Sequence, residues 1–254
     1  MPRRMEMVKM PRYKITLAYD GTDYGGWQIQ PNSPTVQAQV EKAVHAITQE
    51  QVKIHGSGRT DQGVHARRQV AHMDLEKPRA PEVLLRGLNA RLPPDIRIAK
   101  VAEVAQTFHA RKSVKEKEYR YFIWNAPVMD PFHLRYKLHV RRPLDVAAMR
   151  AGAACLVGRH DFAALTANPN REVESTVRTV FACDVKKRGA DVVLVVRGEG
   201  FLYKMVRSMA GLLVRVGQGE LPPEDVRRIL LSRERTARVP TALPQGLFLW
   251  NVRY

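Results

Sequence analysis

Apolar and polar residues alternate along several short segments of the chain, and this period of two is typical of strands with one buried face. Residues 13–19 show the pattern clearly and end at the turn signal Asp20-Gly21, so we predict a strand there. The same pattern predicts further strands at residues 52–55, 69–75, 95–99, 118–124, 177–186, 191–197 and 246–252. The short Gly-containing connection 187–190 indicates a hairpin.

Apolar residues spaced three and four apart predict helices between these strands. Thr35 is placed to cap a helix whose apolar stripe includes Val36 and Val40. Pro81 is placed to open a second helix. Three more helices are predicted at residues 145–157, 205–216 and 222–232.

Strands and helices follow one another without a strict βαβ order, which favours the α+β class. The two halves of the chain have similar content, so we expect two related subdomains, residues 1–105 and 106–254. The apolar segments 205–216 and 226–231 are compatible both with a core and with a subunit interface. The pattern leaves that choice open.

The charge balance narrows the class of function. The 254 residues include 42 Lys and Arg against 25 Asp and Glu, a formal net charge of +17. The basic residues are spread along the whole length, which favours a folded protein with an extended positive surface for a polyanion, nucleic acid before membrane. No apolar run approaches the roughly 20 residues of a membrane-spanning helix. Cys155 and Cys183 have no zinc-ligand spacing, so we expect thiols in a reducing cytoplasm and no metal site.

The segment 56–65, Gly-Ser-Gly-Arg-Thr-Asp-Gln-Gly-Val-His, carries the strongest chemical signal. It lies between two predicted strands, and its three glycines permit tight turns and close approach of a ligand. Arg59, two residues before Asp61, would help to keep that carboxylate ionised. A charged carboxylate on such a loop can act as a nucleophile or a general base. The alternative is that Asp61 only accepts backbone N–H groups in the turn, the common role of aspartate in loops.

Two further segments have a composition that suits RNA or a buried site. Residues 107–112 mix aromatic, imidazole and cationic side chains, which suits contact with phosphates and stacking, although a solvated loop has the same composition. Residues 117–121 place Tyr119 and Tyr121 on one face of a strand, where packing in the core is the common outcome.

The segments near the C-terminus add a cation and a stiff loop. Residues 198–207 lead into an apolar helix, so Arg207 is expected to be desolvated and to need an anionic partner. Lys204 is expected on the same helix face, near the positive end of the helix. Residues 240–249 form a Pro-rich loop that leads into the last strand, where Leu247 can line a pocket.

Together these segments resemble the TruA family of tRNA pseudouridine synthases. The resemblance spans nearly the whole chain in order and is carried by residues 19–28 (YDGTDYGGWQ), 58–65 (GRTDQGVH), 108–111 (FHAR), 117–121 (KEYRY), 201–207 (FLYKMVR) and 244–247 (PQGL). It implies the pseudouridine synthase fold, in which two similar subdomains join mixed or antiparallel sheets into one extended sheet, with flanking helices and a central catalytic cleft.

The resemblance also implies roles for individual residues. Asp61 would be the nucleophile, with attack on C1′ of the ribose or on C6 of the uracil both open. Arg207 would pair with Asp61, and Leu247 would pack against the base. Tyr119 would stack on the flipped uracil, and whether it also helps to remove the C5 proton stays open. The implied tRNA contacts are Arg59 and Arg79 at the extruded nucleotide, Phe108, His109, Ala110, Arg111 and Lys112 at the backbone, and the loop 167–171.

The implied reaction converts uridine to pseudouridine at tRNA positions 38, 39 and 40 of the anticodon stem-loop. As an isomerisation it calls for no cofactor and no metal. The target base must first leave its stack, which costs a few kcal/mol. The resemblance further implies a cytoplasmic homodimer that binds tRNA across both subunits. Two alternatives stay open: a non-catalytic RNA-binding or ribosome-assembly protein with this fold, and a related synthase that acts on another RNA.

Overall fold

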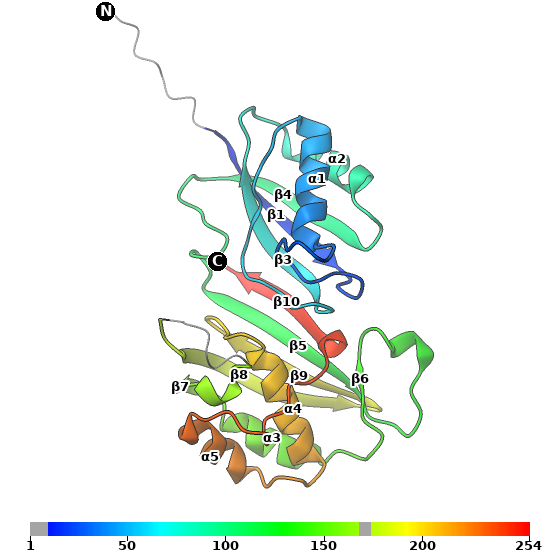
Figure 1. Ribbon diagram of the computed structural model, residues 1–254, viewed down its shortest axis with the longest axis vertical. Coiled ribbons are helices and arrows are strands. Elements are labelled where there is room, and N and C mark those ends of the chain that lie inside the picture. The colour runs from blue at the N-terminus through cyan, green and yellow to red at the C-terminus, as the bar shows by residue number, and fades with distance from the viewer. Residues whose placement is uncertain (1–9, 168–173) are drawn as a thin grey trace, which may run out of the picture.

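The computed structural model describes residues 10–167 and 174–254, and within them ten strands form one mixed sheet. The order across the sheet is β4-β1-β3-β10-β5-β9-β8-β7, with β2 paired to β3 and β6 paired to β5 (Figure 1). The strands are β1 (Arg12–Tyr19), β2 (His55–Gly56), β3 (His65–Asp74), β4 (Ile96–Val104), β5 (Glu116–Trp124), β6 (Leu138–His139), β7 (Gly158–Asp161), β8 (Val177–Arg188), β9 (Asp191–Gly198) and β10 (Leu247–Arg253).

Five α-helices and three short 3₁₀ turns complete the described residues. The helices are α1 (Val36–Thr48), α2 (Pro81–Arg91), α3 (Val146–Ala154), α4 (Met205–Gly217) and α5 (Glu224–Ser232), and the turns are η1 (Pro131–His133), η2 (Ala163–Leu165) and η3 (Pro244–Gly246). The predicted α+β class is confirmed. None of these helices combines the length and the apolarity that crossing a membrane requires.

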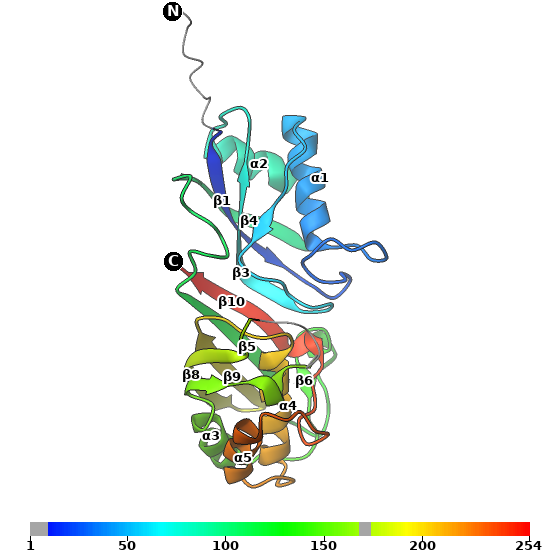
Figure 2. The same ribbon diagram turned by 60° about the vertical axis from the view of Figure 1, so that its left-hand side comes forward.

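One end of the sheet is covered by α1 and α2 (Figures 1 and 2). β1 pairs antiparallel with both β3 and β4, and every second residue of β1, from Tyr13 to Tyr19, is buried. The hydroxyl of Thr35 accepts the N–H of Ala38, so the predicted N-cap of α1 is confirmed. The burial of alternate strand residues against an apolar helix stripe forms the core of this end.

The other end is an antiparallel arrangement of β5, β9 and β8 with α3, α4 and α5 packed near it (Figure 1). The predicted hairpin is present, with β8 and β9 joined at Gly189, whose φ is +58°. All residues of α4 except Arg215 are buried. This helix is therefore core within the chain itself, which answers the question that its apolar pattern left open.

The last strand, β10, joins the two ends. It runs parallel to β3, with Phe248 opposite His65, and antiparallel to β5, with Leu249 opposite Tyr119. Both views show β10 between β3 and β5 (Figures 1 and 2). Because β3 and β10 are parallel and in register at their first residues, the loops that precede them meet at the same edge of the sheet. The division into related subdomains at residue 105 stays a prediction.

Two local predictions were wrong, for reasons that the hydrogen bonds make plain. The predicted strand at 52–55 is a strand only from His55, because α1 side chains take the backbone groups of Ile54: Glu41 accepts its N–H and Gln37 donates to its carbonyl oxygen. Lys204 does not share a helix face with Arg207, because α4 begins at Met205 and Lys204 has a left-handed backbone, with φ of 56°.

Candidate active site

Asp61 lies in the loop between β2 and β3, and β3 holds the first part of this loop. Ser57 donates its backbone N–H to the carbonyl oxygen of Val70 at 2.7 Å and its hydroxyl to Oε1 of Gln69 at 2.6 Å. Nε2 of Gln69 in turn donates to the carbonyl oxygen of Gly58 at 3.0 Å. Ser57 and Gln69 are fully buried, so each lost partner would cost about 1–3 kcal/mol. This network fixes the backbone that leads to Asp61.

The second part of the loop is a tight turn with Asp61 at its head. Val64 donates its N–H to the carbonyl oxygen of Asp61 at 3.1 Å. Gly63 has φ of +74°, a conformation that other residues adopt only with strain. Pro244 of η3 packs closely on Gly63, since a Cβ there would stand 3.0 Å from Cγ of Pro244. The turn therefore lies against the segment that leads into β10.

Residues of the motif 19–28 pack against this loop and hydrogen-bond to it. The hydroxyls of Tyr19 and Thr60 share a buried hydrogen bond of 2.9 Å. Trp27 donates its backbone N–H to the carbonyl oxygen of Thr60 at 3.1 Å. Gly26 has φ of +106°, and a Cβ there would stand only 2.5 Å from that same oxygen. Both its conformation and this close approach require glycine at position 26, so the N-terminal motif supports the residue next to Asp61.

Asp61 and Arg207 form an ion pair, with Nη1 of Arg207 3.1 Å from Oδ2 of Asp61. Their side chains are 22% and 11% exposed, so the pair is largely withdrawn from water but still reachable. Nε of Arg207 donates to the carbonyl oxygen of Ala242 at 2.8 Å, which fixes the plane of the guanidinium. The structure thus supplies the anionic partner that a desolvated arginine needs.

Tyr119 borders this ion pair from β5. The side chains of Tyr119 and Tyr121 lie on one strand face and are buried, as the alternation predicted. Burial first, and then the charges of Tyr19 and Asp61, raise the pKa of Tyr119 above the ordinary value of a phenol. Its hydroxyl is therefore protonated at neutral pH. The ring meets Phe201 edge to face, with centroids 5.3 Å apart, which fixes its orientation.

Leu247 is the first residue of β10 and is buried. It lies opposite Tyr121 on β5, directly after the η3 turn that packs on Gly63. The hydroxyl of Tyr121 donates to the carbonyl oxygen of Leu243 at 2.7 Å, which anchors the approach to η3. The structure therefore brings Leu247 to the same edge of the sheet as the Asp61 loop.

The two predicted flipping residues lie in different places. Arg59 is exposed on the Asp61 loop itself. Arg79 exchanges two backbone hydrogen bonds with the hydroxyl of Tyr13, at 2.8 and 2.9 Å. Tyr13 and Tyr19 are six residues apart on β1, about 20 Å of extended strand. Because Tyr19 contacts the Asp61 loop, the Arg79 backbone lies at the other end of β1 from that loop, and its role at the extruded nucleotide stays a prediction.

The segment 108–112 is pinned to the sheet by internal hydrogen bonds. Nη1 of Arg12 donates to the carbonyl oxygen of Phe108 at 2.7 Å. Ala110 is fully buried, with its N–H on Nδ1 of His72 and its carbonyl oxygen accepting from the hydroxyl of Tyr254. Ala110 therefore anchors the loop, and its contact with RNA stays a prediction.

The other residues of this segment are more open. Arg111 and Lys112 are exposed, and both donate their backbone N–H to Nδ1 of His109. Phe108 is half-buried, with its ring 4.9 Å from that of Tyr254. The exposed cations are thus held on a rigid base. Of the loop 167–171, residues 168–171 lie outside the described part of the chain.

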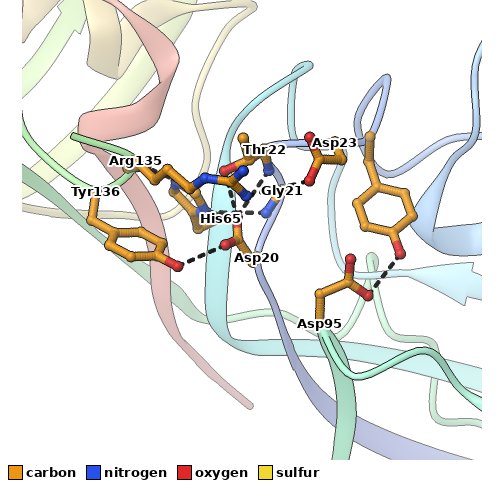
Figure 3. Close-up of polar contacts among 9 residues, drawn as sticks. Asp20, Gly21, Thr22, Asp23, His65, Asp95, Arg135 and Tyr136 are labelled. Atoms are coloured by element: carbon orange, nitrogen blue, oxygen red, sulfur yellow. Dashed lines mark hydrogen bonds and ion pairs between the residues drawn. The ribbon is translucent and has the colours of Figure 1, made fainter. Parts of the chain in front are cut away.

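A polar network follows the Asp61 loop and ties it to a distant segment (Figure 3). His65 accepts the N–H of Gly21 on Nδ1 at 3.0 Å, and its Nε2 donates to the carbonyl oxygen of Arg135 at 3.0 Å. Burial lowers the pKa of His65, so the ring is neutral at neutral pH. Beside it, Asp20 accepts from the hydroxyl of Tyr136 at 2.8 Å and from Thr22. The network joins β1, β3 and the segment before β6.

Sequence reasoning did not assign roles to several of these supporting residues. For Tyr19 and Gly21 the sequence indicates only a strand end and a turn, and Gly26 and His65 belong to segments that carry the resemblance without a role of their own. The sequence signal for these residues is Gly21 and Gly26, since glycines in this segment permit close approach to the Asp61 loop. Among the described residues, no group of three or more His, Cys, Asp or Glu is arranged to hold a metal ion.

Comparison with known proteins agrees with this geometry. Residues 15–111 and 153–254 match the family described as tRNA pseudouridine synthase. The tRNA pseudouridine synthase A of Brevibacillus brevis is 47% identical over 245 residues, covering 96% of this chain and all of that protein. The protein of the same name from Methylacidiphilum infernorum is 43% identical over 242 residues, covering 95% of each chain.

A third relative, the tRNA pseudouridine synthase A of Exiguobacterium sibiricum, is 42% identical and covers 96% of this chain and 97% of its own. A chain in a solved Cbf5-Nop10-Gar1 complex is more distant, at 15% identity and a TM-score of 0.33, covering 80% of this chain and 53% of that chain. The match to the family extends over both groups of strands and both sides of the Asp61–Arg207 pair. The chain therefore belongs to the tRNA pseudouridine synthase family.

Proposed function

We propose that the protein isomerises uridine to pseudouridine at positions 38, 39 and 40 of the anticodon stem-loop of tRNA, with Asp61 as the covalent nucleophile. The observation that carries the proposal is the ion pair between Asp61 and Arg207, placed beside the buried ring of Tyr119. A carboxylate that is held in place by a guanidinium and partly shielded from water is suited to nucleophilic attack.

The chemistry follows from this arrangement. Oδ of Asp61 forms a bond to C1′ of the ribose or to C6 of the uracil, and the N1–C1′ bond breaks. The uracil then turns, C5 bonds to C1′, the bond to Asp61 breaks, and the proton on C5 is replaced by one on N1. The atoms of the uridine are conserved. Arg207 orients the carboxylate before the attack and stabilises its negative charge when it leaves.

Tyr119 and Leu247 would position the base. The raised pKa of Tyr119 leaves its ring available for stacking and its hydroxyl as a hydrogen-bond donor at neutral pH. Leu247, at the start of β10, would contact the uracil from the other side. An apolar surround of this kind holds a flipped base by stacking and by exclusion of water.

Recognition of the RNA would depend mainly on its backbone. Serving three neighbouring positions with one pocket requires an RNA arm that can shift, so contacts with phosphates and with helical shape are better suited than base edges. Exposed Arg59 lies next to the site, and exposed Arg111 and Lys112 lie on the pinned loop. With the net charge of +17, these residues predict an affinity that falls steeply with salt.

A homodimer is proposed as well. Three apolar side chains, Val128, Phe132 and Leu134, are strongly exposed around η1, and exposed apolar surface of this kind supports a further contact. Analytical ultracentrifugation of the full chain tests this: a single species with the mass of one chain at micromolar concentration would contradict it.

The experiment for the catalytic proposal uses anticodon stem-loop RNA with tritium on C5 of uridine. Asp61→Ala should abolish tritium release while RNA binding survives, because the exposed cations remain. Asp184→Ala, which removes an exposed carboxylate on β8, is the matched control and should keep full activity. Tritium release by Asp61→Ala at the unmodified rate would remove Asp61 from its role.

Two outcomes separate the alternatives. RNA binding without tritium release by the unmodified protein would favour a non-catalytic RNA-binding protein. Faster release from ribosomal RNA fragments than from anticodon stem-loops would favour a synthase for another RNA. The proposal requires release from the tRNA arm at positions 38, 39 and 40.

A further inference from the structure

Lys117 brings a cation from β5 to the start of the Asp61 loop. Its Nζ donates to the carbonyl oxygen of Ser57 at 2.8 Å. Lys117 and Tyr119 are two residues apart on β5, so their side chains lie on the same face of the strand. One side chain reaches Ser57 and the other borders Asp61. The ammonium therefore lies beside the site, next to the position proposed for the uracil.

Gly58 is shaped to admit this ammonium. A Cβ at Gly58 would stand 2.7 Å from Nζ of Lys117, and the next heavy atom near it, Cε of Lys117, is 3.8 Å away. Unlike Gly63, Gly58 does not have a positive φ, so its backbone conformation does not itself require glycine. Because Nζ is the end of a flexible side chain, an alanine at position 58 would shift the ammonium and leave the backbone in place.

This cation lacks an anionic partner in the protein. Within the described residues, no carboxylate lies within 4 Å of the Lys117 ammonium, and its one hydrogen bond is to the Ser57 carbonyl oxygen. Burial, and then the positive charge of Arg111, lowers the pKa of Lys117 to about 8. A shielded ammonium near a second cation is unfavourable until an anion arrives. Arg59, the residue after Gly58, is exposed on the same loop.

We propose that Lys117 binds a phosphate of the RNA strand, the one next to the nucleotide held at Asp61, with Arg59 and Arg111 flanking it. The inference rests on the proposed function, because an RNA strand that enters this site is what carries a phosphodiester past Gly58. An ammonium has three protons, and the Ser57 carbonyl accepts one, which leaves two for phosphate oxygens. The contact would hold the strand in place while the base is extruded.

The test is the salt dependence of RNA binding, measured in an Asp61→Ala background so that no turnover occurs. Each phosphate contact that releases a counterion contributes about 0.7 to 0.9 to the slope of log affinity against log salt. Lys117→Gln should therefore reduce the slope by about that amount and weaken binding of the anticodon stem-loop about 3- to 10-fold at 0.1 M KCl. Lys187→Gln removes one exposed charge near the opposite end of the sheet and should leave the slope unchanged.

Gly58→Ala provides an independent variant that keeps the charge. Its Cβ shifts the ammonium from its place against Gly58, so the slope should fall by part of the amount seen in Lys117→Gln. In the double variant Gly58→Ala with Lys117→Gln, the loss should not exceed that of Lys117→Gln alone, because both changes remove one contact. Circular dichroism and thermal unfolding of each variant check the fold. If Lys117→Gln does not fold, the result for Gly58→Ala decides.

A slope equal to that of Lys187→Gln would overturn the proposal, even if catalysis were slower, because Lys117 would then only hold Ser57. The proposed function fails separately. If the unmodified protein releases no tritium but Lys117→Gln reduces the salt dependence of RNA binding, the catalytic proposal is refuted and the phosphate contact of Lys117 is kept. An active enzyme whose slope of log affinity against log salt is unchanged by Lys117→Gln would keep the catalytic proposal and refute the phosphate contact.

Discussion

Nη1 of Arg207 and Oδ2 of Asp61 are 3.1 Å apart, although 146 positions separate the two residues in the chain. The contact spans the sheet junction, because Asp61 precedes β3 and Arg207 is in α4, which packs with the strands beyond β10. The contact therefore bears on two properties of the molecule: the orientation of the Asp61 carboxylate and the correct joining of the two groups of strands.

Replacing Arg207 should lower both the catalytic rate and the stability of the fold. Arg207→Met leaves the Asp61 carboxylate without its partner and the Ala242 carbonyl without its donor, so we expect a loss of at least 100-fold in kcat and about 1.5–3 kcal/mol in the free energy of unfolding. Arg207→Lys keeps the charge but cannot make both bonds, and should recover part of the activity. Single-turnover kinetics and urea unfolding measure the two effects. A Met variant with unchanged kcat would show that the ion pair has no part in catalysis.

Tyr119→Phe separates the hydroxyl from the ring. Because the pKa of Tyr119 is raised by burial and by Tyr19 and Asp61, its phenol stays protonated between pH 6 and pH 9. The variant should therefore lower the rate without changing the shape of the pH–rate profile over that range. RNA affinity should persist, since the ring remains. Loss of an alkaline limb from the profile on making Tyr119→Phe would contradict this assignment.

Gly21→Ala should displace the Asp61 loop at Val64, which packs against Gly21. A Cβ at Gly21 would overlap the carbonyl oxygen of Val64, a backbone atom three residues after Asp61 that cannot move alone. We expect a loss of about 1–3 kcal/mol in stability and a larger fall in kcat than in RNA affinity. Gly200→Ala is the control, because the one heavy atom near its Cβ is 4.0 Å away. Equal thermal unfolding midpoints for Gly21→Ala and Gly200→Ala would show that the Asp61 loop moves to accommodate the extra methyl group without loss of stability.

His72 should make the fold sensitive to acid. It is 2% exposed, and burial first, then the charge of Arg12, lowers its pKa from 6.5 to about 4; His55, His109 and Asp74 also face it. The unfolded chain takes up the proton near pH 6.5 and the folded chain only near pH 4. Stability is therefore complete above pH 6.5 and is lost as the pH falls towards 4, by roughly 3 kcal/mol at most.

His72→Gln tests this, because glutamine can still accept the N–H of Ala110 and does not titrate. Urea unfolding at pH 7 and pH 4.5 should show a smaller loss in the variant than in the unmodified protein. His160→Gln, in β7 at the other end of the sheet, is the control and should lose as much as the unmodified protein. An identical acid loss in all three proteins would remove His72 as the cause.

Local patterns predicted the features that local forces decide. The strict alternation of β1, the hairpin of β8 and β9, and the cap at Thr35 depend on residues close together in sequence. Burial of Arg207 also followed from the apolar helix around it.

Features that depend on residues distant in the sequence could not be predicted from local patterns. The alternation at 52–54 looked like a strand, but the side chains of Gln37 and Glu41 compete for its backbone. Nothing near Arg79 in sequence indicates that β1 holds it at the far end from Asp61. The ammonium of Lys117 at Gly58 likewise needs β5 and the loop to be placed together, which a period of two cannot show.

The position of β10 has a consequence for how the protein is made. The ribosome produces β3 and β5 long before β10, yet β10 is the strand that lies between them and carries Leu247 to the Asp61 loop. During synthesis, β3 and β5 cannot be joined through β10 until that strand has emerged. Pairing over such a sequence separation is slow to form. A nascent chain stalled before this strand would leave two open edges exposed to chaperones, and it would hold Asp61 without a working site.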